Sequence, residues 1–172
     1  MKELHTPISL EQIQELEPGD MIYISGEILT GRDAVLPKLV EEFRTNSDLS
    51  KKININGSVI FHTAVSNAGV GPTSSNKLEI EESMVPLTTY GVKIHLGKGK
   101  IGEKTILGLK ETGGVFAIIP PVTALLESKI IKREVIEFEE EGMEALHAIE
   151  VNKFPVIIAA ARGKSIYDET NE

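Results

Sequence analysis

Residues 71–78, which read Gly-Pro-Thr-Ser-Ser-Asn-Lys-Leu, combine a glycine, a proline, three hydroxyl groups and a cation. Glycine lets the backbone approach a ligand closely, proline fixes one backbone dihedral, and the hydroxyls of Thr73, Ser74 and Ser75 are hydrogen-bond donors. This composition favours a rigid loop that binds an anion. A capped turn before a helix has the same local composition, so the segment alone leaves both interpretations open.

A second glycine-rich segment, 97–102, reads Gly-Lys-Gly-Lys-Ile-Gly and fits the Gly-x-Gly-x-x-Gly pattern of dinucleotide-binding loops. The strand expected after it ends at Ile119-Pro120-Pro121, without the acidic residue that would hold a ribose. The P-loop pattern also fails, because Glu103 stands where its lysine belongs. What remains is either a turn in which Lys98, between two glycines, binds a carboxylate or phosphate, or a plain turn with solvated lysines.

The composition sets limits on the kind of protein. A chain of 172 residues is the size of one domain, and its 41% hydrophobic and 26% charged residues are ordinary for a globular protein. No apolar stretch reaches the roughly 18 residues of a membrane span, and the first five residues lack the layout of a signal peptide. The sequence therefore predicts a cytoplasmic protein.

Charge and cysteine content exclude several site classes. The net charge of −8 argues against a broad surface for nucleic-acid phosphates, although a local cationic pocket is compatible with it. With no cysteine, the chain forms no disulfide and supplies no thiolate to a zinc site or an iron–sulfur cluster. We expect no metal ligands from this chain, so any thiolate-bound metal would belong to a partner.

Periodicity and capping signals predict alternating helices and strands. Ser9 and Gln12 have the spacing of a capping box, and Pro37 suits the first turn of a second helix. The expected helices are 9–17, one from 37, 86–90, 103–112 and 122–128. The expected strands are 21–29, with a bulge or a close backbone contact at Ser25-Gly26, 59–61, 92–96, 115–119, 130–138, 148–151 and 155–161. Segments 46–56 and 63–72 are expected to be a linker and a loop. This order predicts a single layered α/β domain over 1–172 with mixed sheets.

Three separated motifs then occur in a fixed order. Residues 25–34 read Ser-Gly-Glu-Ile-Leu-Thr-Gly-Arg-Asp-Ala, 71–77 read Gly-Pro-Thr-Ser-Ser-Asn-Lys, and 96–99 read Leu-Gly-Lys-Gly; Val-Asn-Lys-Phe-Pro follows at 151–155. In this order, and over nearly the whole chain, they resemble the C-terminal domain, or β subunit, of class I iron–sulfur hydro-lyases, the fumarate hydratase and L-tartrate dehydratase family.

The resemblance implies a swivelling β/β/α domain that works beside an α subunit, in which three cysteines hold a [4Fe–4S] cluster with one open iron. It implies reversible elimination of water from a small 2-hydroxydicarboxylic acid of the malate/fumarate or tartrate type. In such a reaction the open iron is a Lewis acid for the hydroxyl, while a base removes a proton from the neighbouring carbon. The implied assembly is a hetero-oligomer with the α subunit, or a homodimer when the chain is isolated.

The resemblance also implies roles for individual residues. Arg32 is the expected anchor for a substrate carboxylate, since its planar fork suits two parallel hydrogen bonds. Thr73 matches the proton acceptor, a role that needs a relay or a strongly positive setting because a free hydroxyl is a very weak base. Lys98 is expected to bind a substrate carboxylate. The remaining positions implied for substrate binding are Gly71, Ser74 and Lys77.

The chain departs from the family pattern at two positions and in one loop. Lys77 replaces an arginine, Leu36 replaces a histidine, and the segment between His62 and Gly71 is shorter. These departures favour an alternative, a non-catalytic paralogue that binds an anion or a partner without chemistry. A nucleotide-binding domain is a third hypothesis. His62 is expected to be a histidine at a strand end rather than a metal ligand.

Overall fold

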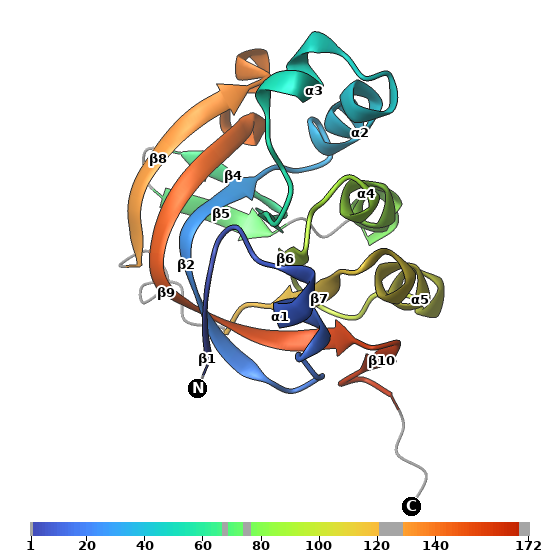
Figure 1. The fold of residues 1–172 in the computed structure, drawn as a ribbon. Helices are drawn as coiled ribbons and strands as arrows, with labels where there is room; N and C mark the ends of the chain where they lie inside the picture. Colours follow the sequence, from blue (N-terminus) through green and yellow to red (C-terminus); the bar gives the residue numbers. More distant parts are fainter. Residues whose placement is uncertain (1, 67–68, 74–76, 121–128, 169–172) are drawn as a thin grey trace, which may run out of the picture.

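A sheet that closes on itself, with helices along one side, is the main feature of the computed structural model (Figure 1). The structure describes residues 2–66, 69–73, 77–120 and 129–168; for 64–66, 69–73, 77–80, 131 and 143 it describes only the backbone. The described elements are β1 (Lys2–His5), α1 (Leu10–Gln14), β2 (Met21–Thr30), α2 (Leu36–Arg44), α3 (Asp48–Lys52), β3 (Val59–Phe61), β4 (Thr63–Ser66), β5 (Gly69–Thr73), α4 (Lys77–Thr89), β6 (Ile94–Gly97), α5 (Glu103–Thr112), β7 (Val115–Ile118), β8 (Ile130–Glu137), η1 (Glu139–Glu144), β9 (Leu146–Ala161) and β10 (Lys164–Ser165).

Five strands close the barrel. β2, β3, β6 and β7 are parallel neighbours in that order, and β9 is antiparallel to both β7 and β2, which completes the ring. β1 extends the sheet parallel to β2, while β8 and β10 pair with β9. The prediction of an α/β fold with mixed strand directions is confirmed, and the closure of the sheet was not predicted.

The barrel interior holds the largest core cluster. Side chains of β3 and β6 alternate, so that Val59 and Phe61 point into this cluster while Ile60 belongs to a second cluster under the helices. The Phe61 and Phe154 rings meet edge to face inside the barrel, with centroids 5.9 Å apart. Because these residues come from strands on both sides of the ring, burying them holds the barrel closed.

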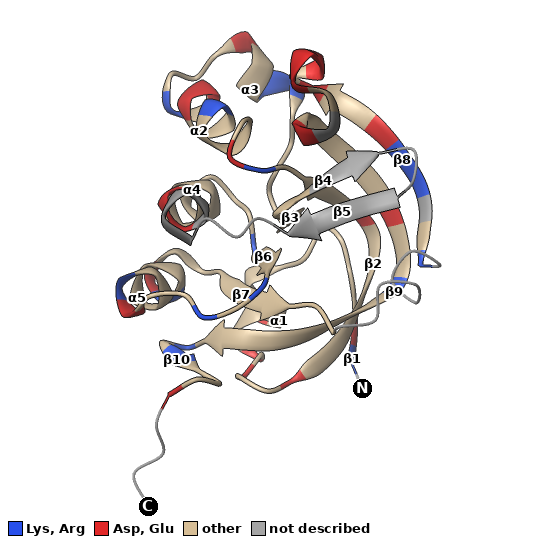
Figure 2. Ribbon diagram, turned by 180° about the vertical axis from the view of Figure 1, so that it is seen from behind, with Lys and Arg blue, Asp and Glu red and all other residues tan. Residues whose placement is uncertain are grey.

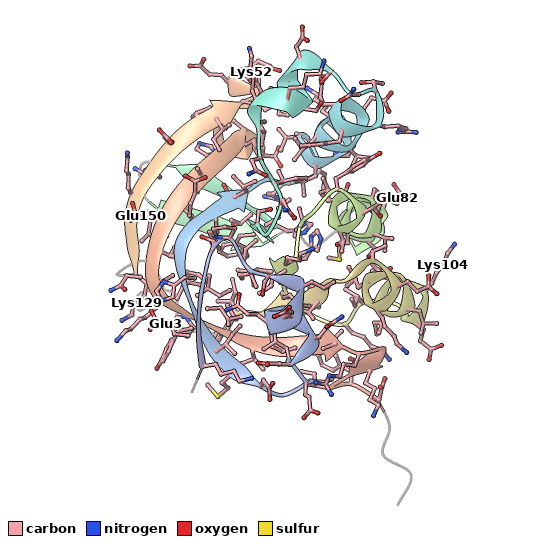
Figure 3. The ribbon with its side chains drawn as sticks, viewed as in Figure 1. Glu3, Lys52, Glu82, Lys104, Lys129 and Glu150 are labelled. Atoms are coloured by element: carbon pink, nitrogen blue, oxygen red, sulfur yellow. The ribbon has the colours of Figure 1, made fainter. Side chains whose placement is uncertain are left out.

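The helices cover one side of the sheet. α4 packs between α2 and α5, and residues of α4 and α5 form a third core cluster with β7 and β9. Glu82 on α4 and Lys104 on α5 point away from the sheet into solvent (Figure 3). The helical layer is therefore apolar toward the barrel and charged outside. None of the helices in the described ranges has the length and apolar character needed to span a membrane.

Several local predictions are confirmed. Ser9 caps α1 in a capping box with Gln12, proline lies in the first turn of α2, and α5 ends at Gly113 in the left-handed conformation (φ 91°). The register of β2 against β9 shifts between Ile24 and Gly26, which is the predicted bulge. These signals depend on neighbouring residues only, so the sequence carries them directly.

Other local predictions were wrong. The expected loop at 63–72 contains the β4–β5 hairpin, the expected linker at 46–56 contains α3, and the helix expected at 86–90 begins at Lys77 and carries Pro86 inside it. The two strands expected near the end are one strand, β9, because a backbone irregularity at Lys153 (φ 50°) lets it bend and continue past Pro155. The helix expected at 122–128 lies outside the described residues.

Candidate functional site at the carboxyl edge of the barrel

Three parallel strands end side by side and place the expected site residues at one edge. Thr30 at the end of β2 is in register with Phe61 of β3, which is in register with Leu96 of β6. Arg32 follows Thr30 by two residues and Lys98 follows Leu96 by two residues. With strand spacings of about 4.8 Å, the two backbones are about 10 Å apart, a distance that long cationic side chains span easily.

Thr73 reaches the same edge through the hairpin. Its backbone is paired with Thr63, which lies two residues beyond the end of β3, between the strands that carry Arg32 and Lys98. Gly71 and Thr73 are strand residues of β5, not parts of a loop as the sequence predicted. Lys77 begins α4, and Ser74 lies outside the described residues. At the level of the backbone, the first and second motifs therefore meet at this edge.

Arg32 is held by its own turn. Its carbonyl accepts hydrogen bonds from the N–H groups of Val35 (3.1 Å) and Leu36 (3.0 Å), which joins it to the start of α2. A Cβ on the preceding Gly31 would approach the Val35 and Leu36 side chains to 2.9 Å, so this turn needs glycine. Leu36 is buried in the core under α2, which accounts for an apolar residue at that position.

The Arg32 side chain is about one quarter exposed and lies beside a carboxylate. Nε is 3.5 Å from Oε1 of Glu144, in the acidic η1 turn, which Figure 2 shows in red where β8 ends. The contact is an ion pair without hydrogen-bond geometry, and Nε is buried without a hydrogen-bond partner in the described part of the chain. Arg32 thus has a neighbouring charge and an unused donor.

Unpartnered polar atoms gather at this edge. In the described residues, four buried side-chain polar atoms have no hydrogen-bond partner, and three of them are Thr30 Oγ1, Arg32 Nε and His62 Nδ1, at the ends of β2 and β3. A buried polar group without a partner costs about 1–3 kcal/mol, so folded proteins rarely keep one without a reason. Thr30 and His62 are fully buried, so of the three only Arg32 is exposed enough to meet a polar ligand at this edge.

Lys98 is exposed in a turn that its two glycines shape. A Cβ on Gly97 would come within 3.1 Å of the Phe116 ring, and Gly99 has a φ of 78°, which favours glycine. The turn holds the Lys98 backbone against the end of β6. Its ammonium is free to approach an anion from solvent.

The N-terminus of α5 is occupied by a side chain. The Gly102 N–H donates a 2.7 Å hydrogen bond to Oε1 of Glu81 on α4. In a dinucleotide site or a P-loop, a phosphate would lie at this helix end. Because a carboxylate of the chain holds that place, the structure favours neither nucleotide interpretation of 97–102.

A buried pair of histidines lies beside the site. His62 Nε2 is 3.0 Å from Nδ1 of His95, whose Nε2 is 2.9 Å from the Thr88 hydroxyl on α4. Burial lowers the pKa of His62 to about 3, and burial together with the His62 ring lowers the pKa of His95 well below its usual value. Both rings are neutral at pH 7. His62 directly follows β3, as predicted for a histidine at a strand end.

Sequence reasoning did not identify His95, Glu81 or Glu144. His95 had a usable signal, because it stands at an outward-facing position in the alternating strand Ile-His-Leu-Gly. No signal of that kind exists for Glu81 and Glu144, which meet their partners through tertiary contacts. Within the described ranges, no group of three or more His, Cys, Asp or Glu side chains is placed to hold a metal ion.

Comparisons with known proteins show the family of the chain. The family model described as Fumarase C-terminus matches residues 2–170. The L(+)-tartrate dehydratase subunit beta of Escherichia coli K12 is 33% identical over 173 residues, which cover 92% of this chain and 82% of that protein. A protein of Methanocaldococcus jannaschii, provisionally named as the same subunit, is 31% identical over 96% of this chain and 90% of its own length.

A longer relative shows how such a chain corresponds to part of another protein. The protein of Geobacillus stearothermophilus provisionally named fumarate hydratase class I is 30% identical over 96% of this chain but only 33% of its own length. This chain corresponds to about one third of that protein. The extent of the matches and the order of the motifs lead to one conclusion: the chain belongs to the fumarase C-terminal family, which includes tartrate dehydratase β subunits and a segment of class I fumarate hydratases.

Proposed function

We propose that this chain is the β subunit of an iron–sulfur hydro-lyase that reversibly removes water from a small 2-hydroxydicarboxylic acid of the malate/fumarate or tartrate type. The observation that carries the proposal is the meeting of Arg32, the Thr73 backbone and Lys98 at one edge of the barrel. A dicarboxylate needs two cationic contacts a few ångströms apart, and this edge offers them in a chain whose net charge is −8.

In this proposal each residue has a separate role. Arg32 binds one substrate carboxylate through its fork, in competition with Glu144, and Lys98 binds the other as a mobile point charge. Gly71, Ser74 and Lys77 line the same substrate. Thr73 accepts the proton from the carbon next to the hydroxyl-bearing carbon. The unused Arg32 Nε–H is available to donate to a substrate oxygen.

The cofactor of the proposed reaction is a [4Fe–4S] cluster held by a partner α subunit. The side chains of this chain fit an arrangement in which the partner holds the cluster and this chain binds the substrate. The chain has no cysteine to ligate a cluster, and it offers cations and hydroxyls that can bind the substrate. When bound in the partner, the cluster supplies a Lewis acid for the substrate hydroxyl. The residues of this chain bind the carboxylates and hold the proton acceptor.

The proposal extends to assembly and movement. The carboxyl edge is completed by the α subunit in a cytoplasmic hetero-oligomer, and the chain moves as a single swivelling domain relative to that partner. The beta-subunit names of the relatives support this assembly.

The direct test is reconstitution. The chain is co-expressed anaerobically with a cysteine-bearing α subunit, and hydration of fumarate and dehydration of malate and tartrate are followed. We expect turnover of at least one of them, with Arg32→Ala lowering kcat/KM and Lys104→Ala, which removes an exposed cation of α5 outside the site, leaving it unchanged. An assembly with an intact cluster and no turnover of any of these acids would refute the proposal.

The second candidate is a non-catalytic subunit, favoured by Lys77 in place of the family arginine. A point charge there loses the two-pronged geometry of a guanidinium. Titration calorimetry and kinetics of Thr73→Ala separate the two candidates. If the dicarboxylate binds and the rate of the assembled enzyme is unchanged by Thr73→Ala, the binding role stands and the catalytic role of Thr73 is wrong.

A further inference from the structure

A histidine that the function proposed above does not use lies at the mouth of the barrel. His147 is the second residue of β9, and it is paired in register with Thr30, the last residue of β2. Strand residues two apart point to the same face, and the next such pair, Ile28 with Ile149, belongs to the core cluster inside the barrel. His147 and Thr30 therefore face the barrel interior, at the edge where β2 ends and the chain continues to Arg32.

The contact between Arg32 and η1 fixes the place of His147 relative to the proposed carboxylate anchor. Arg32 follows Thr30 by two residues, and Glu144, whose carboxylate is 3.5 Å from Arg32 Nε, precedes His147 by three residues. Antiparallel partners lie about 5 Å apart and two residues of extended chain span about 7 Å, so the backbones of His147 and Arg32 are within about 12 Å of each other. A small dicarboxylate bound by Arg32 is long enough to reach the His147 ring.

One hydrogen bond fixes where the His147 ring carries its proton. Nδ1 is 2.9 Å from the carbonyl oxygen of Ala145, the residue between η1 and β9. A carbonyl oxygen only accepts hydrogen bonds, so Nδ1 carries a proton and donates it. In a ring with one proton, Nε2 then has a lone pair and no hydrogen. His147 thus offers a hydrogen-bond acceptor at the tip of its side chain.

No side chain in the described part of the protein occupies this acceptor. The contact with Ala145 is the one hydrogen bond that the His147 ring makes with the described residues. Thr30 faces the same way on the neighbouring strand, but its hydroxyl has no hydrogen-bond partner among these residues and so does not donate to Nε2. His147 is 7% exposed, whereas His62 and His95 are 0% exposed. The ring is therefore nearly buried but still open to a ligand at the mouth.

A neutral acceptor beside a cationic anchor distinguishes between substituents of a ligand. A carboxylate oxygen has no hydrogen to donate and is repelled by the Nε2 lone pair, so the carboxylate binds Arg32. The carbon next to that carboxylate carries either a hydroxyl, which donates to Nε2, or hydrogen alone, which leaves Nε2 without a partner. A site that binds a hydroxyl in this way selects against the analogue that lacks it, because the acceptor has then lost its contact with water and gained nothing.

We propose that His147 is a specificity-determining residue, whose Nε2 accepts a hydrogen bond from a substrate hydroxyl on the carbon next to the carboxylate that Arg32 binds. This hydroxyl is the one that stays on the substrate when the other is eliminated. A diacid with hydroxyls on both central carbons provides it, whereas malate has a CH₂ group at that place. The selection among hydro-lyase substrates rests on the proposed function, while the contact with the hydroxyl is tested without turnover.

The first experiment is ¹⁵N NMR of the His147 ring in the full chain at pH 8, where a histidine ring ordinarily carries one proton. The spectrum distinguishes ring nitrogens with and without a proton, and we expect the proton on Nδ1. Added tartrate should shift the Nε2 signal, because a tartrate hydroxyl donates to it, and succinate, the same diacid without hydroxyls, should shift it much less. A proton on Nε2, or equal responses to tartrate and succinate, would overturn the proposal.

Kinetics of the assembled enzyme test the consequence through one quantity, the ratio of kcat/KM for tartrate to kcat/KM for malate. His147→Phe keeps a ring of similar size and loses the acceptor, so we expect it to lower this ratio about tenfold, the equivalent of one hydrogen bond. His147→Gln, which places an amide oxygen near the Nε2 position, should recover most of the ratio. A purely structural role of His147 would lower both values of kcat/KM together.

The matched control is His5→Phe, the same substitution at an exposed histidine of β1, which should leave the ratio unchanged. A ratio in His147→Phe equal to that of the wild type would overturn the proposal.

The failures of the two proposals are distinguishable. An assembly that turns over none of these acids refutes the hydro-lyase function and leaves the NMR experiment to decide the contact between His147 and a hydroxyl. Turnover with a tartrate-to-malate ratio that His147→Phe does not change refutes the specificity role alone.

Discussion

The stability of the protein should fall steeply as the pH is lowered from 7 to 5, because of the two buried histidines. In the folded state burial keeps both rings neutral, with the pKa of His62 near 3 and that of His95 well below 6.5. In the unfolded chain each ring has a pKa of about 6.5 and takes up a proton below it. The unfolded state thus binds more protons over this range, and acid favours it.

The size of the effect follows from the difference in proton binding. For His62, with an unfolded pKa of about 6.5 and a folded pKa of about 3, the free energy of unfolding decreases by about 2 kcal/mol between pH 7 and pH 5. Burial also holds the pKa of His95 well below its usual value, so its ring adds to this loss, which is already a substantial part of the roughly 5–15 kcal/mol that typical domains possess. Below pH 5 carboxylates begin to titrate, so the window from 5 to 7 isolates the histidines.

Urea denaturation of the full chain at pH 7, 6 and 5 measures this decrease. Replacing both histidines, His62→Gln with His95→Gln, should remove most of the pH dependence, whereas replacing the exposed His5 by glutamine should leave it intact. A free energy of unfolding that varies by less than about 1 kcal/mol in the wild-type chain would show that the rings are not held neutral, and would refute the reasoning.

Three further predictions concern the site and its frame. Arg32→Lys should raise the KM for the dicarboxylate about tenfold in steady-state kinetics, since it keeps the charge and loses the fork, and an unchanged KM would contradict the anchoring role. Glu144→Gln should lower that KM by up to about fivefold, because a competing carboxylate 3.5 Å from Arg32 is removed; a higher KM would mean that Glu144 positions Arg32 instead. Gly91→Ala should destabilise the fold by about 2 kcal/mol in urea denaturation, since Gly91 has φ 124° and its added Cβ would lie 2.7 Å from the Asn56 Cα. The same change at Gly19, which has open space around it, should cost less, and equal losses would contradict the steric argument.

Much of the local structure could be predicted from the sequence because its causes are local. The Ser9 capping box, the Gly113 helix end and the bulge beside Gly26 depend on a few adjacent residues. Closure of the barrel could not be predicted, since β9 must pair with both β2 and β7, and no short-range pattern encodes those pairings. The bend at Lys153 was missed for a similar reason, because the neighbouring proline indicated a break.

The residues of the candidate site likewise fall into those that a local sequence pattern indicates and those that only the fold brings together. Arg32 and Lys98 could be found because glycine-bearing motifs surround them, and the structure explains those glycines by close packing and a left-handed backbone. Glu144 lies beside Arg32, and His95 lies beside His62, only because the fold brings these residues together. The pairing of His62 with His95 joins residues 33 apart in the sequence, on strands whose adjacency appears only in the folded sheet.

The most direct measurement of the central claim is a crystal structure of the chain assembled with a cysteine-bearing α subunit and a bound dicarboxylate. The proposal predicts one substrate carboxylate within hydrogen-bonding distance of the Arg32 guanidinium and the other within reach of the Lys98 ammonium, at the carboxyl edge of β2, β3 and β6. A substrate bound elsewhere, with Arg32 still paired to Glu144 and Lys98 turned to solvent, would contradict it.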